Sequence, residues 1–279
     1  MDKAAGSDSD AVIFDLEDSV PIASKSEARQ IVAQAIDDGR GESQGRPFVY
    51  VRVNGATTGY LAADLEAVVR AGTNAIMLPK AETIEEVRFT ADEIARHENA
   101  NGVRAGTIEI ILQIESALGV HRCFKLIKAS TRVAGTCIGS ARDGDLQTDL
   151  GCAWSIEGQE LLFARSKVLL ETRAAGAHLC PLDGVFSDLN DNDGLAADSR
   201  LSARLGYVGR TIIHPKQITT VRAAYAVAPS EVTYYRTVIS EFEAAEERGV
   251  AAIVVSGKLV DYAMYQRAKR VLDLANLDR

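Results

Sequence analysis

Cysteine is scarce in this chain of 279 residues, which contains four cysteines and four histidines. The cysteines form no C-x-x-C pair and no cluster with histidine at the spacing of a zinc site. They are Cys123, Cys137, Cys152 and Cys180. This pattern favours buried free thiols in a reducing compartment over a disulfide framework or a zinc site.

Long apolar runs are also missing. The first ten residues, Met1–Asp10, have no apolar core, and no run approaches the roughly 20 residues that a membrane-spanning helix needs. We therefore expect no signal peptide, no membrane segment and a cytoplasmic protein.

Basic side chains are outnumbered, with 31 against 39 acidic ones and a net charge of −8. A chain this acidic repels a phosphate backbone, so we expect no nucleic-acid partner. A phosphorylated ligand is still possible, because it needs only a local basic patch. The composition, 47% hydrophobic and 25% charged, is typical of a globular protein, and the length suits one α/β barrel.

Short apolar, β-branched runs alternate with longer amphipathic stretches along most of the chain. The runs predict seven parallel strands covered on both faces: Ala11–Asp15, Phe48–Val53, Ala75–Pro79, Ile108–Ile114, Val133–Ile138, His178–Leu182 and Thr211–His214. The stretches between them predict helices: Ser24–Asp37, Tyr60–Ala71, Thr83–His97, Val120–Ala129, Glu157–Ala175 and Leu195–Leu205. The third of these begins with Thr83-x-x-Glu86, a capping-box pattern. An open doubly wound sheet fits this order too. We favour a TIM-like (β/α) barrel because chemically active residues recur at the carboxyl ends of many strands, which meet at one mouth in a barrel.

The alternation ends after Pro215. The remaining sequence predicts three helices and a short apolar segment: Gln217–Ala226, Pro229–Arg248, Val250–Val255 and Asp261–Leu274. We therefore divide the chain into a barrel domain, residues 1–218, and a C-terminal helical extension, residues 219–279. The extension is expected to act as a lid that moves around Ser256-Gly257.

The first predicted strand ends in three carboxylates within four positions, Asp15, Glu17 and Asp18. Asp15 and Glu17 share a side by the two-residue period of a strand. A surface turn with helix capping would explain them without function. We favour function, because carboxylates at the carboxyl end of a central barrel strand are costly without a task.

Two basic residues follow at the next strand ends. Arg52 stands in an otherwise apolar strand, so it either forms a structural ion pair with Asp15 or Glu17, or binds a substrate carboxylate or oxyanion. Lys80 follows the third strand. It could form a Schiff base, or bind a phosphate or carboxylate.

Carboxylates also follow the fourth and fifth strands. Glu115 comes after one, and Asp143, Asp145 and Asp149 come after the other. Carboxylates from adjacent strand ends are placed to share a hard cation such as Mg²⁺, with water or substrate in the remaining positions. Helix capping is the competing explanation for Asp145 and Asp149.

Taken in order, eight motifs resemble those of the citrate lyase β-subunit-like proteins, within a group of metal-dependent aldolases that includes the malyl-CoA and citramalyl-CoA lyases. They are Phe14-Asp-Leu-Glu-Asp-Ser-Val20, Val51-Arg-Val-Asn54, Met77-Leu-Pro-Lys80, Ile114-Glu-Ser116, Asp145-x-x-x-Asp-Leu-Gly151, Ala164-Arg-Ser166, Ile213-His-Pro-Lys-Gln-Ile218 and Gly257-Lys-x-x-Asp261 with Arg267-Ala268. Each motif alone is weak. Their shared order, from about residue 10 to the end, is specific.

The resemblance implies roles for these residues. Arg52, Glu115 and Asp145 match the family's substrate- and metal-binding positions, with Glu115 and Asp145 as ligands of Mg²⁺ or Mn²⁺. Asp261 resembles the acid on a C-terminal lid that in related lyases reaches the active site of a neighbouring subunit. A homo-oligomer, trimer or hexamer, is therefore expected.

The chain departs from the family pattern twice. The family's usual first strand, with its Phe-x-Pro-Gly-like turn, has no counterpart, which explains seven strands instead of eight. The loop from Gly139 to Asp145 is longer than the usual Gly-x-x-Asp. The Asp-Leu-Gly register selects Asp145 as the ligand, whereas counting from the strand end selects Asp143.

We therefore expect a Mg²⁺-dependent lyase that cleaves, or forms, a 3-hydroxyacyl thioester of CoA or a carrier protein. Arg52 would oppose the developing negative charge, and Lys80 would help to bind substrate. Glu17 with Asp15 would orient metal-bound water or assist proton removal. Asp261 would protonate the enolate. The alternatives are a hydroxy-oxo-acid aldolase that uses pyruvate enolate without CoA, and an inactive homologue that serves as a binding subunit.

Overall fold

The computed structural model describes residues 7–39, 47–176 and 178–277. Residues 1–6, part of the segment in which we expect no signal peptide, lie outside this range. The chain divides into two compact units, Met1–Ala224 and Tyr225–Arg279. The division falls within helix α9 (Ile218–Tyr225), a few residues beyond the boundary drawn from sequence. No helix in the described part of the chain is long and apolar enough to cross a membrane.

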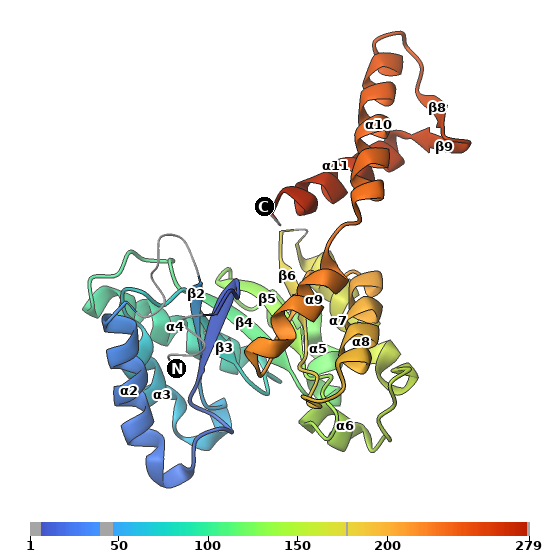
Figure 1. Ribbon diagram of the computed structural model, residues 1–279. Coiled ribbons are helices and arrows are strands. Elements are labelled where there is room, and N and C mark those ends of the chain that lie inside the picture. The colour runs from blue at the N-terminus through green and yellow to red at the C-terminus, as the bar shows by residue number, and fades with distance from the viewer. Residues whose placement is uncertain (1–6, 40–46, 177, 278–279) are drawn as a thin grey trace. The chain divides into compact units, whose positions relative to one another are not determined.

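The first unit is built on a seven-stranded parallel sheet whose strands follow one another in chain order (Figure 1). The strands are β1 (Ala11–Asp15), β2 (Phe48–Arg52), β3 (Ala75–Leu78), β4 (Glu109–Ile114), β5 (Val133–Ile138), β6 (Cys180–Asp183) and β7 (Gly209–Arg210). Within the described residues β1 and β7 do not pair, so the sheet curls into a half-barrel that stays open between them. The prediction of a seven-stranded, TIM-like α/β fold is confirmed.

Helices connect successive strands and cover the outside of the sheet (Figure 1). They are α2 (Lys25–Asp37), α3 (Leu61–Val68), α4 (Ile84–Ala100), α5 (Ala117–Ile127), α6 (Asp145–Leu150), α7 (Gln159–Ala175) and α8 (Asn192–Leu205). The capping box expected before α4 is present: the Thr83 hydroxyl accepts from the Glu86 N–H, and the Glu86 carboxylate accepts from the Thr83 N–H.

The central strands β3, β4 and β5 are almost entirely buried on both faces, whereas β1, β2 and β6 alternate buried with less buried residues. All four residues of β3 are buried, for example. On the inner face of the sheet, Ala75, Met77, Ile111 and Cys137 form a core cluster. This packed interior supports the strand ends, where the polar residues begin.

The prediction of the last barrel strand was wrong in position. We expected it at Thr211–His214, but β7 covers Gly209–Arg210. The β-branched run misled the assignment: the Thr211 N–H still donates to the Asp183 carbonyl, but Ile213 is exposed and His214 already caps the short helix Pro215–Gln217.

The second unit consists of α10 (Pro229–Glu246), α11 (Tyr262–Leu277) and an antiparallel hairpin of β8 (Ala252–Val255) and β9 (Lys258–Asp261). The turn of this hairpin lies at Ser256-Gly257, where the sequence suggested a mobile segment, and β9 covers Asp261, where the sequence suggested a helix start. Both turn residues have positive φ, 49° and 76°, as a two-residue type I′ turn requires. The hydrophobic core of the second unit includes Val238, Phe242, Val255 and Val260.

Candidate active site

The turn after β1 fixes two of the predicted carboxylates. Asp15 accepts hydrogen bonds from the N–H groups of Glu17 (2.9 Å) and Ser19 (3.2 Å), and from the Ser19 hydroxyl. From α2, the Lys25 ammonium donates to the carbonyl oxygens of Leu16 and Glu17, both at 2.7 Å. The turn is thus held from both sides, and the Glu17 side chain is buried at the edge of the sheet, with 5% of the residue exposed.

Arg52 ends β2 in register with Asp15. Its Nε and Nη2 donate to the two Asp15 oxygens at 2.8 and 2.6 Å, and its Nη1 lies 3.1 Å from Glu17 Oε2. Burial alone would raise the pKa of Asp15, but the hydrogen bonds and charge of Arg52, aided by Ser19, lower it to about 2. The structural ion pair considered from sequence is therefore present. The Nη1 side of the guanidinium, next to Glu17, remains to meet an anionic ligand.

Lys80 follows β3 in a left-handed backbone conformation, with φ 50°, which costs a non-glycine residue about 1 kcal/mol. Its Nζ lies 3.0 Å from Glu17 Oε1 and 3.1 Å from Asp145 Oδ2, and its N–H donates to Glu115 Oε2 at 3.3 Å. Burial would lower the pKa of Lys80, but hydrogen bonds to Glu17 and Asp145 raise it above its usual value. The Lys80 ammonium therefore contacts Glu17 and Asp145, while the Lys80 backbone N–H contacts Glu115. A charged ammonium is unsuited to Schiff-base formation.

Glu115 follows β4 and is clamped by its neighbours. Gln113 Nε2 donates to Glu115 Oε1 at 2.6 Å. A Cβ atom on Gly139 would lie 2.8 Å from Glu115 Cγ, so glycine at this position lets the side chain lie against the end of β5. Burial, and then the negative charge of Glu17, raise the pKa of Glu115 to about 7.

Asp145 is the first residue of α6, and its side chain is about half exposed. Lys80 connects it to Glu17, whereas among the contacts of the described residues none links the Asp143 carboxylate to the other predicted site residues. Asp143 has a φ of 59°, and its N–H donates to Gln147 Oε1. Asp149 accepts from the Ala117 N–H at the start of α5, so capping explains this residue. The geometry therefore favours Asp145 as the candidate ligand.

Together these side chains form what we call the acidic cluster, at the carboxyl ends of β1 to β4 and in the loop after β5: Asp15, Glu17, Arg52, Lys80, Glu115 and Asp145. Four carboxylates face two cationic groups, so the fully ionised cluster carries two excess negative charges. Glu17 Oε2 is buried and accepts no directional hydrogen bond, despite its ion pair with Arg52.

This donor set fits a hard divalent cation. Mg²⁺ prefers carboxylate oxygens and often uses only one or two of them, keeping water or substrate as its other ligands. In the described ranges no group of three or more histidine, cysteine, aspartate or glutamate side chains is arranged to hold a metal. Glu115 and Asp145 are thus a two-carboxylate candidate site, and the excess negative charge around them would favour a cation.

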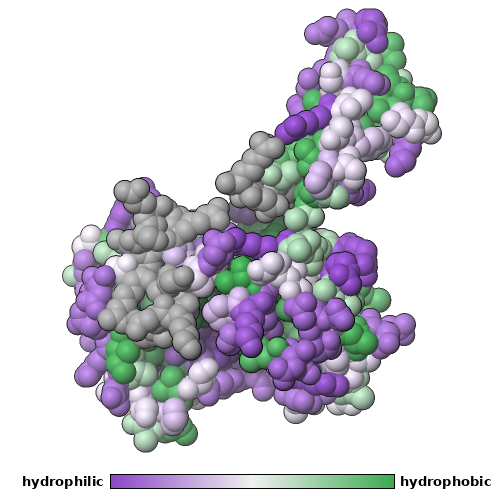
Figure 2. All heavy atoms as spheres, in the orientation of Figure 1, coloured by the Kyte–Doolittle hydropathy of each residue, from purple (hydrophilic) through white to green (hydrophobic). Residues whose placement is uncertain are grey.

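Asp261 belongs to the C-terminal unit. It ends β9, and its Oδ1 accepts from the N–H groups of Ala263 (2.9 Å) and Met264 (3.1 Å). The helix-capping alternative is therefore present, and a catalytic role for Asp261 stays a prediction. By the two-residue period Asp261 shares one face of the hairpin with Val254 and Leu259, which are 67% and 62% exposed. Figure 2 shows this hydrophobic surface over the hairpin.

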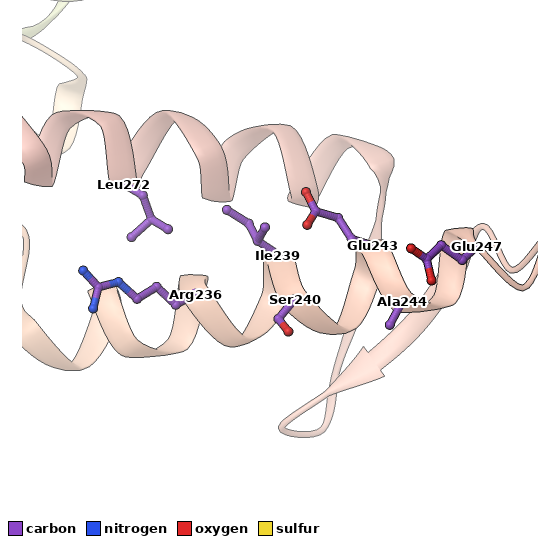
Figure 3. A pocket seen from close by; sticks show the side chains of 7 residues that line it. All are labelled: Arg236, Ile239, Ser240, Glu243, Ala244, Glu247 and Leu272. Atoms are coloured by element: carbon purple, nitrogen blue, oxygen red, sulfur yellow. The ribbon is translucent and has the colours of Figure 1, made fainter.

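Two hollows lie outside the acidic cluster. The first, about 270 Å³, lies between the loops after β5 and β6, and its lining includes Ser140, Arg142, Trp154, Phe186 and Asp188. The Arg142 guanidinium lies over the Trp154 ring, 4.7 Å from its centre. The second is a hollow between α10 and α11 in the C-terminal unit, lined by side chains such as Arg236, Ile239 and Leu272 (Figure 3). Neither contains a predicted site residue.

Sequence reasoning missed the residues that hold the cluster in place. Gln113 lies two residues before Glu115, so the strand period could have identified it as a neighbour on the same side. Gly139 follows β5 directly, which is a position where close approach is common. Asp183, which is fully buried at the end of β6, gave no signal because its partners come from distant segments.

Two protein families match the chain. The family described as HpcH/HpaI aldolase/citrate lyase matches residues 1–215. The family described as C-C bond lyase of the TIM-barrel fold matches residues 171–278.

Individual relatives agree with these families. The chain is 36% identical to citrate lyase subunit beta of Leuconostoc mesenteroides subsp. cremoris, over 96% of this chain and 86% of that protein. It is 29% identical to mitochondrial citramalyl-CoA lyase of Mus musculus, over 95% of this chain and 79% of that protein. Its structure resembles the crystal structure of protein CitE from Mycobacterium tuberculosis in complex with magnesium, acetoacetate and coenzyme A, with TM-score 0.74, 29% identity and coverage of 96% and 90%.

Proposed function

Because the chain belongs to the HpcH/HpaI aldolase/citrate lyase family and is a lyase related to enzymes of CoA thioesters, we propose that it is Mg²⁺-dependent. Its proposed substrate is a 3-hydroxyacyl-CoA such as malyl-, citramalyl- or citryl-CoA. The products would be an acyl-CoA and an oxo acid, and the reverse condensation uses the same residues. One observation carries this proposal: the acidic cluster joins Arg52, Lys80, Glu115 and Asp145 around Glu17.

Glu115 and Asp145 would hold the metal ion. When bound there, Mg²⁺ would supply Lewis-acid chemistry that lowers the pKa of the substrate hydroxyl. The structure around these residues supports this role, since Gln113 and Gly139 orient Glu115 before any ligand arrives.

Cleavage involves two changes of charge: the substrate hydroxyl loses its proton, and the acyl fragment becomes an enolate. Glu17 is suited to the first and Arg52 to the second. Burial raises the pKa of Glu17, and Glu17 Oε2 has a free acceptor position, so this carboxylate can take the hydroxyl proton. When the carbon–carbon bond breaks, its electron pair moves into the acyl fragment as a thioester enolate. The Nη1 side of Arg52 would oppose this negative charge, and Asp15 would hold the guanidinium in orientation.

The enolate must then be protonated on carbon. We propose that Asp261 delivers this proton from the C-terminal unit of a neighbouring subunit in a homo-oligomer. One observation supports it: the hairpin presents Asp261 on the same face as exposed Val254 and Leu259, an apolar surface of the kind that a lid excluding water needs. As expected from the sequence, we propose that the reaction takes place in the cytoplasm.

The proposal is tested by incubating the protein with malyl-, citramalyl- and citryl-CoA and detecting the released acyl-CoA and oxo acid by mass spectrometry. We expect turnover of at least one ester with Mg²⁺, none after EDTA treatment, and none from Glu115→Ala. Cleavage of a 4-hydroxy-2-oxo acid without CoA would instead identify an aldolase. If no ester is cleaved although Mg²⁺ and CoA raise the melting temperature, the protein is a binding subunit.

A further inference from the structure

Four charged side chains form a buried network on the β6–β7 side of the sheet. Asp183 ends β6, Arg165 lies in α7, Asp198 in α8, and Arg210 ends β7. Arg165 donates to Asp183 and, at 2.9 Å, to Asp198, and Arg210 Nη2 lies 2.8 Å from the other Asp198 oxygen. Arg210 also donates twice to the carbonyl of Gly184, at 3.0 and 2.7 Å. We call this group the buried network.

Stability alone does not explain the buried network. Two carboxylates and two guanidinium groups balance in charge, but their desolvation makes such a group no more stabilising than apolar side chains of similar size. Arg165 Nε is even left buried without a hydrogen-bond partner. The backbone pairing on this side is short, since β6 has four residues and β7 has two. A positional role is therefore the better explanation: the network fixes strand ends that the short ladder holds weakly.

The Ser140 hydroxyl connects the buried network to the Gly139–Asp145 loop, which ends at a candidate metal ligand. Ser140 Oγ donates to Asp183 Oδ1 at 2.7 Å, and the Gly184 N–H donates to the same oxygen at 2.8 Å and to Ser140 Oγ at 3.2 Å. Ser140 directly follows Gly139, which packs against Glu115, and begins the stretch that leads to Asp145. The end of β6 thus holds the loop whose two ends determine where the candidate metal ligands lie.

The packing at Gly184 shows how tightly this contact is built. A Cβ atom there would lie 2.6 Å from the carbonyl oxygen of Ile138 and 2.7 Å from the amide nitrogen of Ser140. Both are backbone atoms, which cannot move aside as the tip of a flexible side chain can. The loop after β5 and the end of β6 therefore have one close-packed arrangement.

We propose that Ser140 and Asp183 are positioning residues for the metal site. Through the Ser140 hydroxyl, the buried network fixes the Gly139–Asp145 loop and with it the spacing of the Glu115 and Asp145 carboxylates. This inference rests on the proposed function, because it assigns the loop to Mg²⁺ binding. It adds residues that touch neither metal nor substrate and that act only through the geometry of the loop.

Ser140→Ala tests the proposal, with Ser199→Ala as the matched control. Both serines are buried and bond to the network, but Ser199 accepts from Arg210 Nη1 and lies in α8, away from the loop. Mg²⁺ binding to the metal-free protein is measured by calorimetry and by the fluorescence of Trp154, the single tryptophan. We expect Ser140→Ala to bind Mg²⁺ about tenfold more weakly, as is usual when a supporting hydrogen bond of a metal site is lost. Ser199→Ala should keep the wild-type affinity, while the melting temperatures of the two variants fall to a similar extent.

Gly184→Ala provides a second test, because it displaces the Ser140 backbone without removing the hydroxyl. It too should weaken Mg²⁺ binding. Wild-type affinity in Ser140→Ala, or equal weakening in Ser199→Ala, would overturn the positioning role alone. An absence of Mg²⁺ binding in the wild-type protein would overturn the proposed function as well, so the two failures are distinguishable.

Discussion

Replacing Glu115 by glutamine should stabilise the metal-free protein at neutral and alkaline pH while abolishing its metal site. The pKa of Glu115 is about 7 in the folded protein, against a usual 4.5. Between about pH 4.5 and pH 7, Glu115 keeps its proton in the folded protein but has lost it in the unfolded chain. Folding stability from this group therefore falls as pH rises through 4.5 to 7, and the loss is complete above about pH 7.

The size of the effect follows from the shift. One pKa unit corresponds to about 1.4 kcal/mol, so ionised Glu115 costs roughly 3 kcal/mol above pH 7. Glutamine removes this cost and keeps an acceptor for Gln113, but it turns an amide group toward the Lys80 N–H. That mismatch costs about 1 kcal/mol. A net gain of about 2 kcal/mol should raise the melting temperature by roughly 4–8 °C in a protein of this size.

Thermal unfolding in EDTA at pH 4.5, 6 and 8 measures this directly. The difference between Glu115→Gln and wild type should be small at pH 4.5 and greatest at pH 8, and the exposed Glu157→Gln control should show no such trend. Added Mg²⁺ should then stabilise the wild type but not Glu115→Gln. A variant that is less stable than wild type at pH 8 without metal would refute the argument that burial and Glu17 hold Glu115 at a cost.

Three further predictions concern turnover. Arg52→Lys keeps the charge but loses the planar fork, so kcat/KM should fall by about 100- to 1,000-fold with an unchanged fold by circular dichroism; near-normal turnover would remove the oxyanion role. Asp145→Asn should lose both Mg²⁺ binding in calorimetry and turnover, whereas Asp143→Asn should keep both; the reverse result would move the ligand to Asp143. Asp261→Asn should keep its melting temperature, because asparagine also caps a helix, and should lose turnover. Mixing it with inactive Arg52→Ala under subunit exchange should restore part of the activity, and mixed oligomers without activity would show that the acid does not act in trans.

The sequence predicted most strands and helices of the first unit, because the spacing of apolar residues in each element matches the faces that the fold buries. The apolar strand runs and the capping box at Thr83 and Glu86 are local signals, and they appear in the structure where they were expected. The last strand was misplaced because β-branched Thr211, Ile212 and Ile213 have strand propensity, while pairing with β6 is decided by tertiary contacts at Gly209 and Arg210.

The hairpin in the C-terminal unit was missed for a different reason. Ser256-Gly257 lies between two short apolar segments, which is the signal of a two-residue hairpin turn. We interpreted the glycine as a hinge and began the last helix at Asp261, although Asp261 ends β9. The two turn residues, rather than the apolar segments beside them, indicate the hairpin.

The candidate site was predictable only as a set of residues, not as an arrangement. Arg52, Glu17, Lys80 and Glu115 follow strand ends, so their meeting at one mouth follows from parallel topology. That Asp15 would occupy two nitrogen atoms of Arg52 does not follow from sequence, because the register of β1 and β2 decides it. The support from Ser140 and Asp183 depends on contacts across 43 positions, for which the sequence has no local signal.

The cost of the acidic cluster and its affinity for a cation have one physical origin. Without metal and above about pH 7, Glu115 is ionised against burial and against the charge of Glu17, and Lys80 links Glu17 to Asp145. A divalent ion would relieve this repulsion, and at ten times its dissociation constant it would return about 1.4 kcal/mol of stability. Below about pH 7, binding must first remove the Glu115 proton, so the apparent affinity for Mg²⁺ should fall up to tenfold per pH unit. Mg²⁺ should therefore bind most tightly above about pH 7, where the metal-free protein is least stable because Glu115 is ionised.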